Sequence, residues 1–189
     1  MTIIEHLERY LGPIAEGWMD HAASDDGIRV RIVRFAHAPY DGATTFCTIG
    51  HSGHIAEMDD GRMVRQELLF STTANYPADQ VASFLLTLST YLRSRTKALL
   101  RGEVIGPSAP IFPGVTVNAV YASMPVIFPQ GLELYNESTP PTVLVWLIPL
   151  LAPEAEFVRQ QGWDSFEDLL EDRNPDLLDL NRLPLVNNS

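Results

Sequence analysis

The stretch Val143-Leu144-Val145-Trp146-Leu147-Ile148 carries six apolar residues in a row. A half-exposed strand alternates apolar and polar residues, whereas a strand covered on both faces is apolar throughout. We therefore expect a central strand here, and we expect Pro149 to end it because proline lacks the N–H that a sheet ladder uses. A sheet with both faces covered requires helices or loops on each side of it.

Three strands are predicted upstream of this one. Residues 28–32 alternate apolar residues with arginines, which predicts a strand with one polar face that ends or bulges after Ile32. Residues 44–49 are rich in β-branched side chains, as strands commonly are. Residues 64–70 place apolar side chains on one face, with Arg65 and Glu67 on the other.

The longest predicted helix begins at Pro77, since proline suits the first helical turn. Residues 103–114 are rich in glycine and proline and predict a loop, so Gly102 is the expected end of the helix. Strands are predicted at 115–121 and 131–135. Apolar side chains at helical spacing predict one buried stripe on the helix, formed by Val81, Phe84, Leu85, Leu88, Tyr91 and Leu92.

Shorter helices are predicted near both termini. Residues 2–11 begin with a capping-box pattern. Residues 153–162 begin with proline and end with glycine. Asp164, with Glu167 three residues later, predicts a second capping box. We expect residues 187–189 to fray.

These elements predict an α+β fold in which a mixed, mostly antiparallel β-sheet is packed with helices. The length of 189 residues suits a single domain over residues 1–189. A chain of this size buries enough surface to hold a core without a disulfide or a structural metal.

The charge of the chain is acidic and uneven. The net charge is −11, and nine acids and two arginines between residues 153 and 180 supply seven of those negative charges. Binding to nucleic acid needs many lysines and arginines, so we expect no nucleic-acid partner. The acidic stretch can simply keep the protein soluble, or it can attract a basic partner. The candidate partner-binding surface consists of Glu154, Asp164, Glu167, Asp168, Glu171 and Asp172.

The sequence also indicates a compartment. One cysteine, Cys47, forms no internal disulfide and anchors no zinc site alone. The N-terminus lacks the basic and then apolar layout of a signal peptide. No apolar run reaches the roughly 18–20 residues of a membrane span. We expect a soluble cytoplasmic protein without a membrane partner.

The segment Gly50-His51-Ser52-Gly53-His54 is the first candidate for chemistry. A nucleophile elbow requires Gly-x-Ser-x-Gly, and here the second glycine falls one residue early. His51 and His54 could bind a metal, but two glycines disfavour the helix that would align them, so polar loop residues are the simpler interpretation. Cys47 lies among apolar neighbours and is interpreted as a buried residue. No dinucleotide or phosphate-loop motif is present. We therefore expect no catalytic residues, metal or cofactor.

Several segments, taken in order, resemble the Suppressor-of-fused domain family. The resemblance is strongest over residues 44–172, about two-thirds of the chain, and its most specific part is the closing strand and helix pair. The matching segments are Thr48-Ile49-Gly50-His51-Ser52, Arg65-Gln66-Glu67-Leu68-Leu69-Phe70, Tyr76-Pro77-Ala78, Gly102-Glu103-Val104, Val145-Trp146-Leu147-Ile148-Pro149-Leu150, Glu154-x-x-Phe157, Gln161-Gly162-Trp163 and Leu169-Leu170-Glu171.

The resemblance implies a mixed α/β sandwich that binds protein without catalysis. Animal members bind Gli-type factors through an added β-strand, helped by a second domain that this chain is too short to contain, so that partner is not carried over. Single-domain bacterial members resemble immunity proteins that neutralise toxins. The first hypothesis is therefore an immunity-type protein whose partner is a basic toxin domain. The alternatives are an adaptor that captures a peptide at a sheet edge and, third, an enzyme that uses the His51/His54 loop with a metal.

Overall fold

In the computed structural model, residues 1–19 and 27–186 are described, so the prediction for residues 187–189 lies outside this part of the chain. The helices are α1 (Ile3–Leu11), α2 (Ala78–Arg93), α3 (Ala152–Gln161) and α4 (Trp163–Arg173), with a 3-10 turn, η1 (His51–Gly53). The strands are β1 (Ile14–Met19), β2 (Arg31–Ala36), β3 (Ala43–Ile49), β4 (Ile55–Glu57), β5 (Met63–Thr73), β6 (Val104–Ile105), β7 (Ala119–Ser123), β8 (Leu134–Tyr135) and β9 (Thr142–Leu150).

The strands form one nine-stranded sheet in the order β1-β2-β3-β5-β9-β7-β6, with β4 paired to β5 and β8 paired to β9. The pairing of β5 with β9 is parallel, and the other pairings between named strands are antiparallel. The α+β prediction, with a mixed and mostly antiparallel sheet, is therefore confirmed. β9 lies between β5 and β7, so the apolar stretch does form a central strand.

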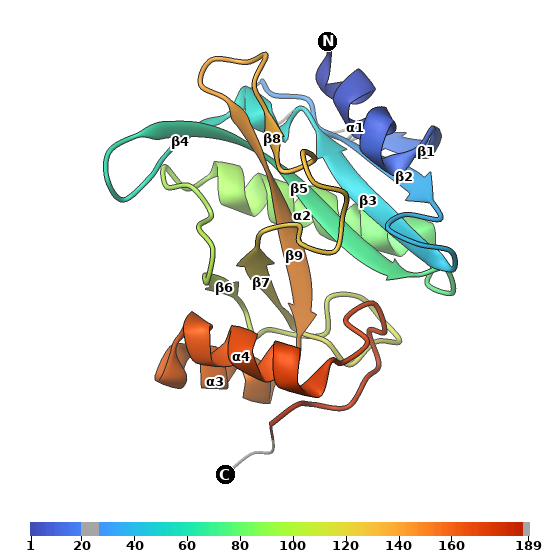
Figure 1. Cartoon of the computed structure of the whole chain (residues 1–189), viewed down its shortest axis with the longest axis vertical. Coiled ribbons are helices and arrows are strands. Elements are labelled where there is room, and N and C mark those ends of the chain that lie inside the picture. Colours follow the sequence, from blue (N-terminus) through green and yellow to red (C-terminus); the bar gives the residue numbers. More distant parts are fainter. Residues whose placement is uncertain (20–26, 187–189) are drawn as a thin grey trace.

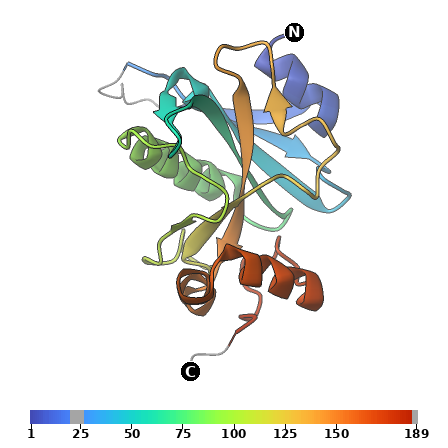
Figure 2. The ribbon, with the colours of Figure 1, turned by 60° about the vertical axis from the view of Figure 1, so that its left-hand side comes forward.

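Both faces of the sheet are covered, as the unbroken apolar stretch predicts. α2 packs on one face, while α1 and the segment between β7 and β8 cover the other (Figure 2). α3 and α4 lie at the end of the sheet where β9 finishes (Figure 1). Adjacent residues of β9 alternate between the two cores: Val145 and Leu147 pack with α2, and Trp146 and Ile148 pack on the opposite side.

Pro149 does not end the central strand, which continues to Leu150. The pairing of β5 with β9 stops at Leu147, so beyond this point β7 is the only one of the described strands that neighbours β9. The carbonyl of Pro149 accepts a hydrogen bond from Arg182 at 3.1 Å. Proline is tolerated because no sheet neighbour needs the missing N–H there.

The first strands differ from the sequence prediction. β1 was not predicted, and the second strand spans Arg31–Ala36 rather than 28–32. Ile32 and Val33 are both buried, because the two faces of β2 are both covered. The irregularity expected after Ile32 lies instead in β1, where the register shifts between Ile14 and Glu16.

Three further predictions need correction. α2 ends at Arg93 rather than Gly102, and Tyr91 is half exposed instead of buried. The predicted strand at 115–121 is β7, shifted to Ala119–Ser123, and the predicted loop after Gly102 contains the short edge strand β6. No side chain caps α4: Gly162 is its N-cap, so the predicted Asp164 capping box is wrong. The capping box of α1 and the strand at 44–49 are confirmed.

Candidate protein-binding surfaces

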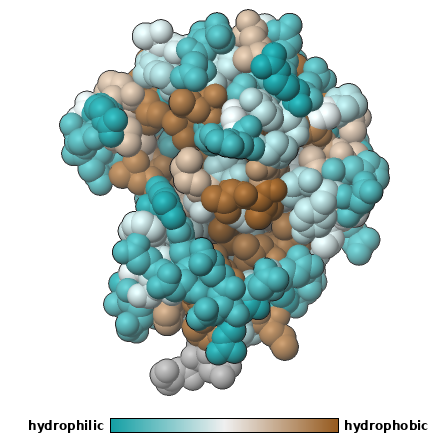
Figure 3. Space-filling view, viewed as in Figure 1, coloured by the Kyte–Doolittle hydropathy of each residue, from teal (hydrophilic) through white to brown (hydrophobic). Residues whose placement is uncertain are grey.

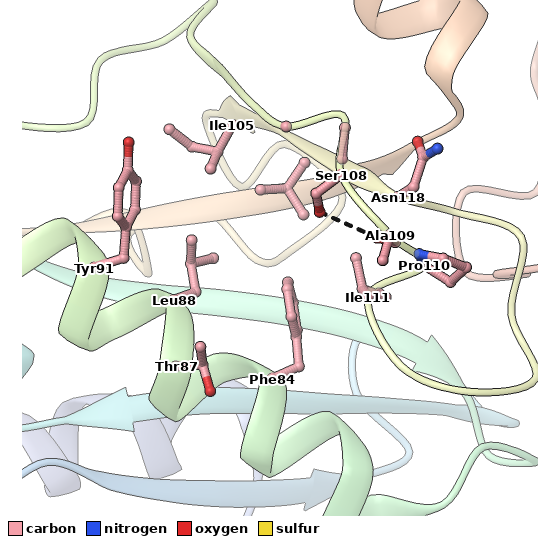
Figure 4. A pocket seen from close by; sticks show the side chains of 13 residues that line it. Phe84, Thr87, Leu88, Tyr91, Ile105, Ser108, Ala109, Pro110, Ile111 and Asn118 are labelled. Atoms are coloured by element: carbon pink, nitrogen blue, oxygen red, sulfur yellow. Dashed lines mark hydrogen bonds between the residues drawn. The ribbon is translucent and has the colours of Figure 1, made fainter.

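A groove of about 420 Å³ separates α2 from the segment that follows β6. Figure 4 shows Phe84, Leu88 and Tyr91 pointing from the helix toward Ile105 and Ile111 on the opposite wall. These groove residues are mostly apolar, and Tyr91 adds a hydroxyl at one end. Concave apolar sites with a few polar groups are where ligands and peptides commonly bind.

Helix geometry explains why one wall of the groove stays open. Val81, Leu85 and Leu92 face the core, and the row through Phe84 and Tyr91 lies to one side of that stripe. Phe84 still packs edge to face on a core ring, with its centroid 5.3 Å from that of Phe70. The sequence prediction treated both rows of side chains as one buried stripe. The phenol hydroxyl of Tyr91 was the available signal that this side chain faces solvent.

The opposite wall is fixed by main-chain bonds. The amide of Ser108 donates to the Asn118 carbonyl at 3.0 Å. Gly106 approaches the same carbonyl so closely that a Cβ would lie 2.8 Å from its oxygen, and its φ of +99° also favours glycine. Arg159 of α3 donates to the Gly106 carbonyl. These contacts hold the segment after β6 in place as the second wall of the groove.

The predicted acidic surface is only partly a surface. Asp164, Asp168, Glu171 and Asp172 are exposed along α4. None of these four forms an ion pair with the rest of the described chain. They remain available to a partner.

Glu167 is instead engaged within the protein. Its carboxylate accepts hydrogen bonds from the Tyr121 hydroxyl at 2.7 Å and from the guanidinium of Arg101. Partial burial acts to raise the pKa of Glu167, but these bonds outweigh it and hold that pKa below its ordinary value. The Arg101 guanidinium also lies over the Trp163 ring, 4.6 Å from its centroid. Glu167 thus anchors α4 to the sheet.

Glu154 does not belong to the surface at all, because its side chain is fully buried at the start of α3. Arg182 binds both of its oxygens, with Nη2 at 2.7 Å from Oε2. The amides of Leu151 and Leu185 donate to the same carboxylate at 3.0 Å each. This prediction is corrected: Glu154 ties the C-terminal segment to the end of β9.

The segment 50–54 is held by the buried carboxylate of Glu67. Its Oε1 accepts from the Gly50 amide at 2.8 Å and from the Ser52 hydroxyl at 2.7 Å, and its Oε2 accepts from the Thr48 hydroxyl at 2.5 Å. Burial raises the pKa of Glu67 above its ordinary value, against the opposing effect of these hydrogen bonds. The Ser52 hydroxyl therefore helps to hold this segment against β5.

The two histidines of this segment also bind the surrounding chain. His51 Nδ1 lies 2.8 Å from the Ser89 hydroxyl, and His54 Nε2 lies 3.1 Å from the Arg95 carbonyl. Among the residues that the structure describes, no cluster of three metal-ligating side chains occurs. Burial raises the pKa of the Cys47 thiol well above its ordinary value, which disfavours the reactive thiolate.

No helix in the described ranges is long and apolar enough to cross a bilayer.

No curated protein matches the chain. Solved structures do. A SUFU (suppressor of fused protein) homolog from Neisseria gonorrhoeae is similar with a TM-score of 0.80 at 15% identity, covering 99% of this chain and 96% of that one.

A structure described as the Sufu-Fu complex is similar with a TM-score of 0.74 at 13% identity, covering 97% of this chain and 90% of that one. Drosophila Suppressor of Fused gives a TM-score of 0.71 at 12% identity over 97% of this chain, which spans 50% of the Drosophila chain. At these identities the structures show a shared fold. The family model of the Suppressor of fused protein (SUFU) matches residues 26–183. The chain therefore belongs to the Suppressor of fused family.

Proposed function

We propose that this chain is a non-enzymatic, cytoplasmic immunity-type protein that binds a basic toxin domain and occludes it. Family membership supports binding to another protein, since one relative of the same fold is described in a complex between Sufu and Fu. The acidity of the chain supports a basic partner, because complementary charge speeds encounter and disfavours wrong partners.

The observation that carries the proposal is the unfavourable charge pattern of α4. Asp164 and Asp168 are four residues apart, as are Asp168 and Asp172, so like charges face one another along the helix. Glu171 and Asp172 also lie in the last turn, where the helix dipole favours cations. Each such like-charged pair costs a helix about 0.2–0.5 kcal/mol. A basic partner would relieve this repulsion.

The proposal expects a toxin-like gene beside the gene for this chain, and the test is co-expression with the product of that gene; the lack of such a gene would count against the proposal. The proposal expects growth arrest by that product alone, rescue by this chain, and a complex of the two purified proteins in calorimetry. Binding should weaken as salt is raised, because salt screens the attraction between exposed charges. At physiological ionic strength this attraction already reaches only about 8 Å. Absence of both rescue and complex formation would refute the immunity role.

A second candidate function is capture of an extended peptide. The groove in Figure 4 adjoins β6, which is an edge strand of the sheet, and an added strand could pair there while its side chains enter the groove. Hydrogen exchange with a candidate peptide separates the two functions. Peptide capture protects whichever amide of Val104 and Ile105 points away from β7, whereas binding at α4 leaves its exchange unchanged.

A further inference from the structure

A second apolar cavity, of about 220 Å³, shares no lining residue with the groove of Figure 4. Val64, Val143 and Val145 from β5 and β9 line it, and Met58 and Met124 contribute flexible thioether side chains. Methionine has three rotatable bonds and adapts to differently shaped partners, which is why it recurs at binding surfaces. The cavity has room for one large apolar side chain.

Exposed apolar residues continue from this cavity along the segment between β7 and β8. Met124 lines the cavity and is 38% exposed, and Val126 and Ile127 follow it at 75% and 37%. The segment crosses in front of β9 (Figure 1), and apolar residues occupy the middle of the same face in Figure 3. A single exposed apolar residue is ordinary, whereas a contiguous set beside a cavity indicates an interaction site.

The acidic helix borders this apolar area. Arg101 lines the cavity, and its guanidinium stacks on Trp163 and pairs with Glu167 of α4. Arg101 is therefore neutralised by this chain and does not repel a cationic partner. Asp164 and Asp168 lie on the same two turns of α4, exposed to solvent. In Figure 3 the hydrophilic helices α3 and α4 lie directly below the apolar area.

We propose that the cavity and residues 124–127, called here the apolar anchor site, receive an apolar side chain of a basic protein partner, while the exposed carboxylates of α4 face its lysines or arginines. This inference rests on the proposed function and locates its interface. The charge around the site indicates which partner it binds. Unpaired carboxylates beside an apolar site disfavour an acidic or anionic ligand. They favour a protein segment that alternates apolar and cationic residues.

The test uses three short synthetic peptides as probes, one of leucine and lysine, one of leucine and glutamate, and one of serine and lysine. Methionine methyl groups labelled with ¹³C report where they bind, because the chain has five methionines and only two of them line this cavity. We expect the leucine–lysine peptide to shift the signals of Met58 and Met124. Met19, which lies on β1 at the far edge of the sheet, is the internal control.

Variants test the same site by affinity. Val126→Ser and Met124→Gln remove apolar contact from exposed positions, so they leave the fold intact, and each should weaken the leucine–lysine peptide roughly five- to tenfold. Leu183→Ser is the matched control, because Leu183 is 84% exposed and lies outside the site. It should change the affinity less than twofold.

The proposal is overturned if the leucine–lysine peptide does not bind at about 1 mM, the weakest affinity of interest. It is also overturned if the leucine–glutamate or the serine–lysine peptide binds equally well, or if the signals of Met19 and Met124 shift equally. A change of oligomeric state in Val126→Ser, measured by sedimentation, also overturns it, since the site would then serve a second copy of the chain. Rescue from the neighbouring toxin is scored separately, so a failed immunity role and a failed anchor site are distinguishable.

Discussion

Two glutamates are fully buried in different surroundings: Glu67 lies within β5, and Glu154 lies in the first turn of α3, after the end of β9. Glu67 is held by neutral donors, the hydroxyls and amides of residues 48–52. Glu154 is held by a cation, Arg182, together with two amides. In both cases a carboxylate fixes a loop to the sheet. Buried acids in this chain therefore build the fold, and the acids left on α4 are the ones available to a partner.

The largest effect is expected at Glu154. Glu154→Ala leaves the guanidinium of Arg182 buried without its counter-ion, which typically costs about 3–5 kcal/mol of unfolding free energy. Urea unfolding followed by circular dichroism measures this. Glu156→Ala, an exposed acid on the same helix, is the control and should stay within about 0.5 kcal/mol of the parent. A loss below about 1 kcal/mol for Glu154→Ala would mean that the ion pair does not fix the C-terminal segment.

The next effect is expected at Glu67. Glu67→Ala strands the amides and hydroxyls around Gly50 and Ser52, and we expect a loss of about 3 kcal/mol. Glu67→Gln keeps an acceptor oxygen of the same shape and should cost about 1 kcal/mol. Equal losses for the two variants in the same urea titration would show that charge, and not hydrogen bonding, holds this loop.

These two residues also show what the sequence could and could not predict. The apolar run 143–148 predicted the central strand, because six apolar residues in a row are typical of a strand covered on both faces. Glu67 was placed on the face opposite Leu68 and Phe70, but its role in holding residues 50–54 was not predicted, since its donors come from residues 48–52, which a pattern within one strand does not contain. Glu154 was grouped with the surface because Arg182 lies 28 residues away.

The same limit applies to the candidate surfaces. Spacing along α4 correctly placed Asp164, Asp168, Glu171 and Asp172 in solvent, since helical periodicity separates an inner from an outer face. The groove beside α2 was not predicted, because its second wall comes from residues 105–111 and depends on how that segment folds back. Local patterns specify elements, and contacts between distant segments decide which polar residues remain free.

A third expectation concerns the dependence of stability on pH, because the pKa values of Glu67 and Glu167 are shifted in opposite directions. The pKa of Glu167 is lowered in the folded chain, so its stabilising contribution is complete above about pH 4.5 and is lost as pH falls through the lowered value. The pKa of Glu67 is raised, so its contribution is complete below about pH 4.5 and is lost as pH rises through the raised value.

Unfolding free energies of Glu167→Gln and Glu67→Gln, measured between pH 3 and 7 against the parent, check these signs. The deficit of Glu167→Gln should shrink as pH falls below about 4.5, and the deficit of Glu67→Gln should grow as pH falls toward that value. Parallel curves for the two variants would contradict the assignment of their environments.

The smallest effect on stability is expected on α4. Asp168→Asn, Glu171→Gln and Asp172→Asn combined should leave the unfolding free energy unchanged or raise it by about 0.5 kcal/mol, because repulsion along the helix is removed. Thermal unfolding measures this. A loss of more than about 1 kcal/mol would place these acids with Glu67 and Glu154 as structural residues.

The most direct measurement is calorimetric titration of the toxin that this chain neutralises in the co-expression test, with the parent chain and with this triple α4 variant, at low and high salt. We expect the variant to bind at least about tenfold more weakly at low salt, a difference of about 1.4 kcal/mol, and to lose most of its salt dependence. Affinities within twofold of each other, with the same salt dependence, would show that the partner does not use the acidic helix.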